Sequence, residues 1–399
     1  MKKKIVWMIL SCLMVAAPLL VSCTTAVTEE EETTPTADIW LDLLRLIPIE
    51  SDTLQFGVVI NDLHALRTAL GIPLPAPDAS AEELWAYKLQ LLGADDLLST
   101  KPPTYIYPDH FSGLDKYFNP QEWQQTVGFT LANVDQTIYA GAPPLNFQAV
   151  RGRFDENTID QAVRTGPMND LLEDISYKGI EYYSWGGDNE IVLARRSGVR
   201  PLGRGHRMAL IDDYILWTVY TDSLKKMADS YQGSLPSLAT VEEYQLLVQG
   251  LAELGTYTAL FASPKSGPLK REMLFALTSF WEGRTDDEVE HLLRKLFEDS
   301  PLLEPYQVLA AGVGLDEQGY FMGIVLVHTD SEAARQNVRL LEQRLKEAPS
   351  AYTGEVWINQ IEDMEIKSQG RLTLAKLYGD IARNWFGFYE EYDPLLLHK

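Results

Sequence analysis

The chain has 399 residues and a formal net charge of −23 at pH 7, because its 57 acidic residues outnumber the 34 Lys and Arg residues. Affinity for nucleic acid depends mainly on cationic contacts to phosphate, so this balance excludes a nucleic-acid partner, and it also excludes direct docking onto anionic lipid. Hydrophobic residues make up 46% of the sequence, which is enough for packed cores in two domains.

The first 22 residues have the parts of an export signal. Residues 2–4 are lysines, and residues 5–20 are largely apolar but shorter than the roughly 20 residues that a membrane-spanning helix needs. Of the two cysteines, Cys12 lies inside this stretch and Cys23 follows it directly. Removal of residues 1–22 would leave Cys23 alone, so no disulfide can form within one mature molecule.

Leu20-Val21-Ser22-Cys23 resembles the lipobox of bacterial lipoproteins. The resemblance implies that the Cys23 thiol receives diacylglycerol, that the peptide before it is removed, and that the new N-terminus is acylated. The protein would then be extracytoplasmic and held to the bacterial cell membrane by lipid on Cys23. An ordinary signal peptide, or a membrane anchor with an incidental cysteine, is the alternative.

Residues 23–38 follow as a tether rich in Thr and Glu, including four consecutive glutamates at 29–32. The tether has almost no bulky apolar residue after Val27, so it cannot bury enough surface to offset the entropy of ordering, and we expect it to be disordered. Mutual repulsion of the glutamates favours an extended, solvated chain.

The body repeats one pattern, in which an apolar strand is followed by a short polar step and then a helix. Two of these steps are Thr221-Asp222-Ser223 and Thr329-Asp330-Ser331, and their side chains suit a helix start. Paired strands are predicted around the turns at 186–189, 316–319 and 370. Hairpins followed by helices predict an α+β fold with antiparallel sheets, as two related domains over residues 39–250 and 251–399.

The body also resembles bacterial surface lipoproteins built from repeated α+β units, in stretches such as "LIPIESDTLQFGVVIND" and "GSLPSLATVEEYQLLVQGL". This resemblance brings no activity and no catalytic residues with it. The sequence contains no motif for a cofactor, and its six histidines are scattered without metal-ligand spacing. We therefore predict no catalytic residue, no cofactor and no metal site.

One weak lead to an enzyme is Ser223-Leu224-Lys225-Lys226, followed by Lys265-Ser266-Gly267. These two elements resemble motifs of penicillin-binding proteins and class A β-lactamases, which use S-x-x-K and a later K-T/S-G element. The interval between Lys226 and Lys265 is too short for the domain that separates these elements in those enzymes, and helix capping also explains Ser223.

The second lead is aromatic. Tyr182, Tyr183 and Trp185 lie beside a Gly-Gly turn, and exposed rings next to acidic residues could stack on sugar faces. The same residues would also suit a core. The sequence thus favours a non-enzymatic protein that binds a glycan or protein ligand or supports the envelope, and a lipid-anchored hydrolase is the alternative.

Overall fold

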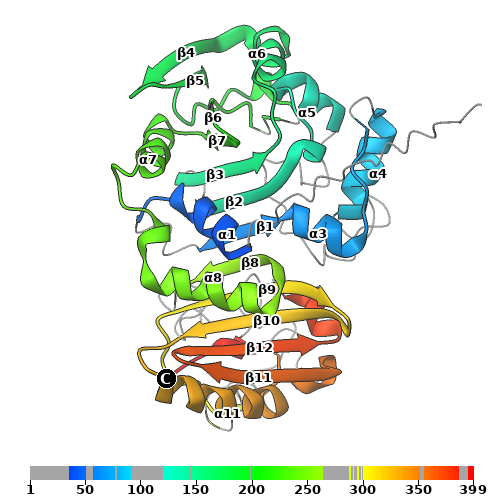
Figure 1. Cartoon of the computed structure of the whole chain (residues 1–399), viewed down its shortest axis with the longest axis vertical. Coiled ribbons are helices and arrows are strands. Elements are labelled where there is room, and N and C mark those ends of the chain that lie inside the picture. The colour runs from blue at the N-terminus through cyan, green and yellow to red at the C-terminus, as the bar shows by residue number, and fades with distance from the viewer. Residues whose placement is uncertain are drawn as a thin grey trace, which may run out of the picture. The chain divides into compact units, whose positions relative to one another are not determined.

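A computed structural model describes residues 36–50, 57–76, 79–91, 120–142, 145–197, 199–200, 202–263, 300–350, 355–385 and 394–399, together with isolated residues between 287 and 298. The described strands form one twelve-stranded sheet in the order β11-β12-β10-β9-β8-β1-β2-β3-β7-β6-β5-β4, which Figure 1 follows. All neighbouring strands are antiparallel, so the predicted α+β class with antiparallel pairing is confirmed. The strands are β1 (Val58–Asp62), β2 (Val134–Ala142), β3 (Leu145–Gly152), β4 (Leu172–Tyr177), β5 (Ile180–Trp185), β6 (His206–Ile211), β7 (Tyr214–Thr218), β8 (Thr256–Ala262), β9 (Val308–Asp316), β10 (Gly319–Val327), β11 (Asp363–Gln369) and β12 (Leu372–Tyr378).

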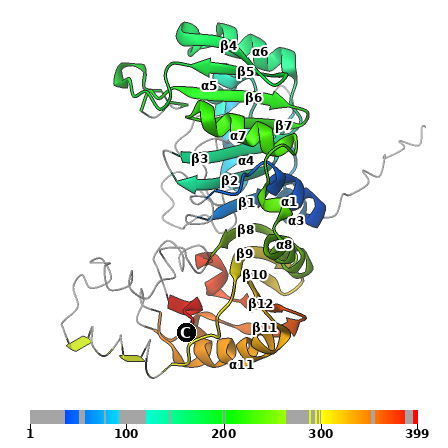
Figure 2. The ribbon, with the colours of Figure 1, turned by 90° about the vertical axis from the view of Figure 1, so that its left-hand side faces the viewer.

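Helices cover both faces of the sheet (Figures 1 and 2). One apolar cluster joins the sheet to α1, α7 and α8, and a second joins its other face to α3, α4, α5, α6 and α11. The α-helices are α1 (Thr36–Arg45), α3 (Leu63–Leu70), α4 (Ala81–Leu91), α5 (Pro120–Val127), α6 (Glu156–Thr165), α7 (Thr221–Tyr231), α8 (Glu242–Leu254) and α11 (Ser331–Glu347). None of the helices in the described ranges is both long enough and apolar enough to cross a membrane.

Burial along the strands follows their place in the sheet. Inner strands such as β1 and β8 are buried at every residue, because helices lie on both faces, and each contains an apolar run, at residues 58–60 and 259–262. The outermost strand β11 instead alternates between exposed and partly buried residues. The other outermost strand, β4, contains Glu173 and Asp174, and charged residues at a sheet edge oppose pairing with another chain.

The connectivity repeats on either side of the central β1–β8 pair. In each half, a helix precedes the central strand, a hairpin follows (β2–β3 or β9–β10), and a helix comes next (α6 or α11). The hairpins β6–β7 and β11–β12 complete the halves, and β4–β5 is an additional hairpin in the first. The predicted boundary between residues 250 and 251 falls within α8, and it stays a prediction because the sheet is continuous across this point. Helix α1 begins at Thr36, inside the predicted tether.

Of the two polar steps that were expected to cap helices, the structure shows capping by a side chain at one. Asp330 accepts from the backbone N–H groups of Glu332 and Ala333 and caps α11. Its counterpart in the repeat is Asp155, which caps α6, and not Thr221-Asp222-Ser223. The N-cap residue of α7 makes no side-chain hydrogen bond. The first backbone N–H of α7 donates instead to Asp188, from a distant turn.

Two of the three predicted hairpin turns are confirmed, at residues 316–319 and at Gly370. The third prediction is wrong, because the residues after the turn at 186–189 do not return along β5. Strand β5 pairs with β4 on one side and with β6 on the other. Residues 186–205 therefore form the β5–β6 connection, which extends beyond the strand ends (Figure 2).

Candidate functional site

Helix α6 is the element around which the candidate site is built. It begins after Asp155, whose carboxylate accepts from the Thr158 N–H at 2.7 Å, and it buries Ile159 and Val163 in the core. These two residues are four apart and fix one side of the helix on the sheet. The flanks of α6 then line two separate hollows, one acidic and one uncharged.

The first hollow, called here the acidic hollow, lies between α6 and strands β4, β5 and β6. Its volume is about 520 Å³. It is lined by five carboxylates and a single arginine, so its formal charge is strongly negative. The lining residues are Glu156, Ile159, Asp160, Arg164, Asp174, Gly179, Ile180, Glu181, Tyr182, Tyr183, Leu210, Ile211 and Asp212.

A hydrogen-bonded network fixes one wall of the acidic hollow. The Tyr183 hydroxyl donates to Asp160 Oδ1 at 2.8 Å, and Arg164 Nε donates to the same oxygen at 2.8 Å. The other two Arg164 nitrogens donate to both oxygens of Asp174, at 2.9 and 3.0 Å. The Arg164 guanidinium also lies 5.7 Å from the centre of the Tyr183 ring. This arrangement joins α6 to the β4–β5 hairpin with paired charges.

The network determines the protonation of its members. The hydrogen bonds from Arg164 lower the pKa of Asp174. Burial, followed by the hydrogen bond to Asp160, raises the pKa of Tyr183. Near neutral pH the wall therefore presents an ionised carboxylate and a neutral phenol.

The rim carries carboxylates outside this network. Glu156 and Glu181 are both exposed, and Asp212 accepts from the Tyr231 hydroxyl. No group of three or more His, Cys, Asp or Glu side chains in the described residues is arranged to hold a metal ion. The five carboxylates of the lining can attract a cationic or hydrogen-bond-donating group beside the Tyr183 ring.

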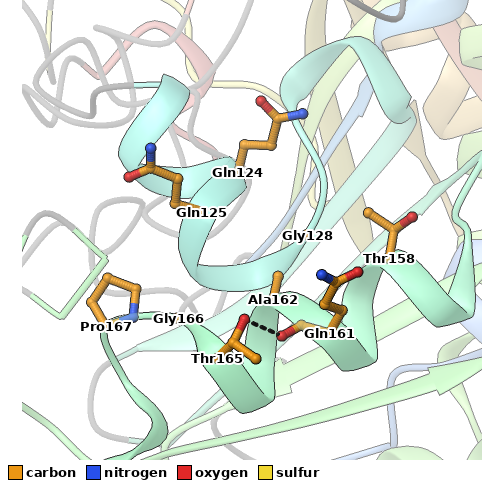
Figure 3. A pocket seen from close by; sticks show the side chains of 9 residues that line it. All are labelled: Gln124, Gln125, Gly128, Thr158, Gln161, Ala162, Thr165, Gly166 and Pro167. Carbon is orange, nitrogen blue, oxygen red and sulfur yellow. Dashed lines mark hydrogen bonds between the residues drawn. The ribbon is translucent and has the colours of Figure 1, made fainter.

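The second hollow, called here the amide groove, lies on the other flank of α6, against α5 (Figure 3). Its volume is about 440 Å³ and its lining has no charged side chain. Two glycines let the helices meet closely: a Cβ on Gly128 would lie 2.6 Å from Ile159 Cα, and a Cβ on Gly166 would lie 2.5 Å from the Gln125 carbonyl oxygen. The lining residues are Gln124, Gln125, Gly128, Thr158, Gln161, Ala162, Thr165, Gly166 and Pro167.

The three predicted aromatic residues do not form one platform. Successive residues of β5 point to opposite faces, so Tyr182 belongs to one apolar cluster while Tyr183 and Trp185 belong to the other. Trp185 is 0% exposed and its ring lies 6.0 Å from that of Trp217. Tyr182 and Tyr183 both line the acidic hollow. Ligand binding by these residues stays a prediction, and the placement limits an accessible ring mainly to Tyr183.

The Ser223–Lys226 lead finds no support in the geometry. Ser223 is buried on α7, and Lys226 forms ion pairs with Glu50 at 3.0 Å and with Asp222 at 3.1 Å. The hydrogen bond with Glu50 raises the pKa of Lys226, which keeps the amine protonated and unable to act as a base toward serine. Lys265-Ser266-Gly267 and the predicted lipid-attachment residue Cys23 lie outside the described residues.

Sequence reasoning missed most of the acidic hollow. The pair Asp160 and Arg164 has the i, i+4 spacing of a helix-surface ion pair, which was a readable signal. Asp174 and Glu181 were not identified, because strand β4 was not predicted and only the β4–β5 hairpin brings them to α6.

No family model matches the chain, and no curated protein matches its sequence. Among solved structures, three crystal forms of TP0453 are similar, each at 9% sequence identity. Form III has a TM-score of 0.33 over 86% of this chain and 96% of that one. Form IV has a TM-score of 0.34 over 88% and 98%, and form I has 0.33 over 88% and 97%. Similarity at this level carries no function from TP0453 to this chain.

Proposed function

We propose that the protein is a lipid-anchored, extracytoplasmic binding protein, attached to the bacterial membrane through Cys23, and that it is not an enzyme. Its ligand is a glycan or protein group that carries positive charge, and the acidic hollow beside α6 receives it. The observation that carries the proposal is the lining of this hollow, in which five carboxylates and the Tyr183 ring surround one arginine that is already paired.

The protonation of the wall favours binding over catalysis. A general acid or base works best with a pKa near the operating pH. In the acidic hollow the pKa of Asp174 is lowered and the pKa of Tyr183 is raised, so both are moved away from neutrality. Both residues are therefore suited to hold a ligand in a fixed charge pattern rather than to transfer protons.

Charge and geometry together indicate the ligand class. The exposed carboxylates of Glu156 and Glu181 come from α6 and β5, on two walls of the hollow, and an amine between them would be attracted by both. The Tyr183 ring adds a surface on which a sugar ring or an alkyl chain can pack. An amino sugar or a basic peptide side chain satisfies both features.

The test compares two sugar trimers that differ only at the 2-amino group, which is a free cationic amine in one and a neutral acetamide in the other. We expect the full-length protein in detergent to bind the trimer of glucosamine, which is cationic, and to bind the trimer of N-acetylglucosamine, which is neutral, at least about tenfold more weakly. Isothermal titration calorimetry at low and physiological salt measures both affinities. A lower affinity for the glucosamine trimer at physiological salt than at low salt would identify the contribution of charge to binding.

The double variant Glu156→Gln, Glu181→Gln should lose about tenfold in affinity for the cationic trimer. The matched control is Glu317→Gln, Glu365→Gln, which removes the same charge from exposed positions on β9–β10 and β11. Equal binding of both trimers would point to a neutral glycan site, and equal loss in both double variants would remove the acidic hollow as the site.

A further inference from the structure

Positive charge is concentrated in the later part of the β5–β6 connection and the start of β6, in an otherwise acidic protein. Residues 191–207 contain five arginines and no Asp or Glu, although the whole chain has a net charge of −23. The arginines are spaced along the connection instead of forming a run. They are Arg195, Arg196, Arg200, Arg204 and Arg207.

The later part of this connection and the first two residues of β6 are called here the arginine loop (residues 191–197, 199–200 and 202–207). Ile191 forms an antiparallel bridge with Arg204, and the Val192 N–H donates to the Gly203 carbonyl at 3.4 Å. Gly203 has φ +64°, and a Cβ there would lie 1.9 Å from the Val192 carbonyl oxygen, so only glycine fits this approach. Leu193 follows one side of this bridge in the sequence, and Leu202 precedes the other side.

The arginine loop exposes aliphatic side chains. Leu193 is 67% exposed, Ile191 is 50% exposed and Leu202 is 39% exposed. Among the described residues, three other large hydrophobic side chains reach such exposure, and they lie far apart in the sequence: Ile49, Leu74 and Leu145. The arginine loop is thus the place in the described structure where exposed aliphatic residues gather, next to a cluster of cations.

Internal contacts hold the loop in this form. Val199 is buried in the core, and Arg200 is buried with its guanidinium donating to the carbonyls of Arg204 at 2.8 Å and Gly203 at 3.3 Å. Arg195 pairs with Asp170 at 3.0 Å. The exposed aliphatic residues therefore lie on a loop that these contacts hold in place.

Not all of the positive charge is neutralised. Arg207 pairs with Asp188 at 2.8 Å, and Arg195 has its partner in Asp170. Arg196 is exposed and Arg204 is half-buried, and within the described residues no carboxylate pairs with either of them. The loop keeps a net cationic surface beside its aliphatic side chains.

We propose that the arginine loop docks on the headgroup region of an anionic phospholipid bilayer, with Ile191, Leu193 and Leu202 entering the interface and Arg196 meeting lipid phosphate. Aliphatic residues beside cations suit this interface, where buried apolar area and attraction to anionic lipid act together. An acidic protein would match the charge but does not require the exposed leucines. The local charge reverses what the net charge of the chain indicates about lipid docking.

This inference rests on the proposed lipid anchor, which supplies the proximity to the membrane. At most about 3.5 Å per residue separates Cys23 from Thr36, where the described body begins, so Thr36 stays within about 45 Å of the attachment point. At such distances the effective concentration of the bilayer surface is high, and a weak second contact suffices for docking.

The experiment places a fluorescent dye beside the exposed leucine. Ala194 is exposed, and Ala194→Cys supplies a thiol for labelling because Cys12 is predicted to be removed and Cys23 to be acylated. In vesicles of phosphatidylcholine with 30% phosphatidylglycerol, we expect a blue shift of the dye and its quenching by brominated lipid. In phosphatidylcholine alone we expect neither. A dye at Gln318→Cys, on the β9–β10 turn, should show neither the blue shift nor the quenching on either kind of vesicle.

Charge variants make the test quantitative. Arg196→Gln should lower the ratio of docked to undocked protein roughly fivefold, and Arg196→Glu roughly 25-fold. Arg339→Glu, at an exposed arginine of α11, is the matched control and should leave the ratio unchanged. Leu193→Ser should reduce quenching with the charge intact.

Three results would overturn the inference: equal signals on both kinds of vesicle, no signal on either, or a blue shift with polyglutamate in solution but not with anionic vesicles. The last of these would assign the loop to an acidic protein partner. Mass spectrometry of the N-terminus of the same preparation reports on the lipid anchor separately. A missing anchor and a loop that does not dock are thereby distinguished.

Discussion

The imidazole of His206 lies against the indole of Trp217, with ring centroids 4.8 Å apart, on the sheet face that α6 covers. Neither imidazole nitrogen has a hydrogen-bond partner within the described residues. Burial is the main cause that lowers the pKa of His206 to about 3, and the nearby Arg200, Arg207 and Arg204 lower it further. A histidine that is neutral in the folded state and protonated in the unfolded state makes stability depend on pH.

His206→Phe should remove this dependence while keeping a ring against Trp217. The unfolded histidine titrates near 6.5 and the folded one near 3, so the wild type loses stability as the pH falls below 6.5. Between pH 7.5 and 5.5 this loss is about 1.4 kcal/mol. Urea unfolding at both pH values should show the wild type losing that much more than the variant. Parallel losses in the two proteins would contradict a neutral buried His206.

Asp188 contacts both helix α7 and strand β6, which lie further along the chain. Its Oδ1 accepts from the Thr221 N–H at 2.9 Å and the Thr221 hydroxyl at 2.7 Å, and it pairs with the buried Arg207. Asp188→Ala would remove the cap of α7 and leave a buried guanidinium without its carboxylate, so we expect a loss of about 2 kcal/mol in the free energy of unfolding.

Asp330→Ala is the comparison for Asp188→Ala, since Asp330 caps α11 through two backbone N–H groups but pairs with no buried arginine in the described part of the chain. Its loss should be smaller. Urea unfolding of both variants gives the difference, and a larger loss for Asp330→Ala would show that the contact between Asp188 and Arg207 contributes little.

Gly128 and Gly179 separate steric contact from backbone strain. Both have positive φ, +83° and +82°, but a Cβ on Gly128 would lie 2.6 Å from Ile159 Cα, whereas a Cβ on Gly179 would meet nothing within 4 Å. Gly179→Ala should therefore destabilise by about 1 kcal/mol, and Gly128→Ala by at least about 2 kcal/mol more, because α6 must move. Thermal unfolding measures both, and equal losses would show that the α5–α6 contact adjusts without strain.

The sequence was informative about the fold where the pattern was local. The hairpin at Asp316–Gly319 and the turn at Gly370 could be predicted because a glycine follows an alternating strand and the partner strand comes next in the chain. The turn at Gly186 was misleading. It also places glycine after a strand, but the next strand that pairs with β5 begins only at His206, and adjacency in the sequence cannot identify a partner so far along.

The candidate site was largely hidden for the same reason. Asp160 and Arg164 are four residues apart, but their contacts to Tyr183 and Asp174 depend on where the β4–β5 hairpin lies. Burial of Trp185 likewise depends on which face of the sheet it occupies, and sequence alone left both faces open. The arginine loop was readable as five arginines without an acid, yet their spacing and the strongly negative total obscured it.

The lipid anchor is the prediction on which localisation depends. Two or more acyl chains on Cys23 would contribute on the order of 0.8 kcal/mol per buried methylene, and anchoring by two chains is stable where one chain is marginal. Cys23→Ala should abolish acylation and lipoprotein-specific cleavage together. The product should then be either uncleaved and retained by its apolar N-terminus, or cleaved elsewhere and released, which fractionation of membranes distinguishes.

The folded body should be unaffected by Cys23→Ala, because the described structure begins at Thr36 and its apolar clusters are built from residues beyond that point. The melting temperature of the body should match that of the wild type. Mass spectrometry of the wild-type N-terminus decides the matter: an acylated Cys23 is expected as the first residue. A mature protein that begins at any other residue, without lipid, would refute the anchor and the localisation that follows from it.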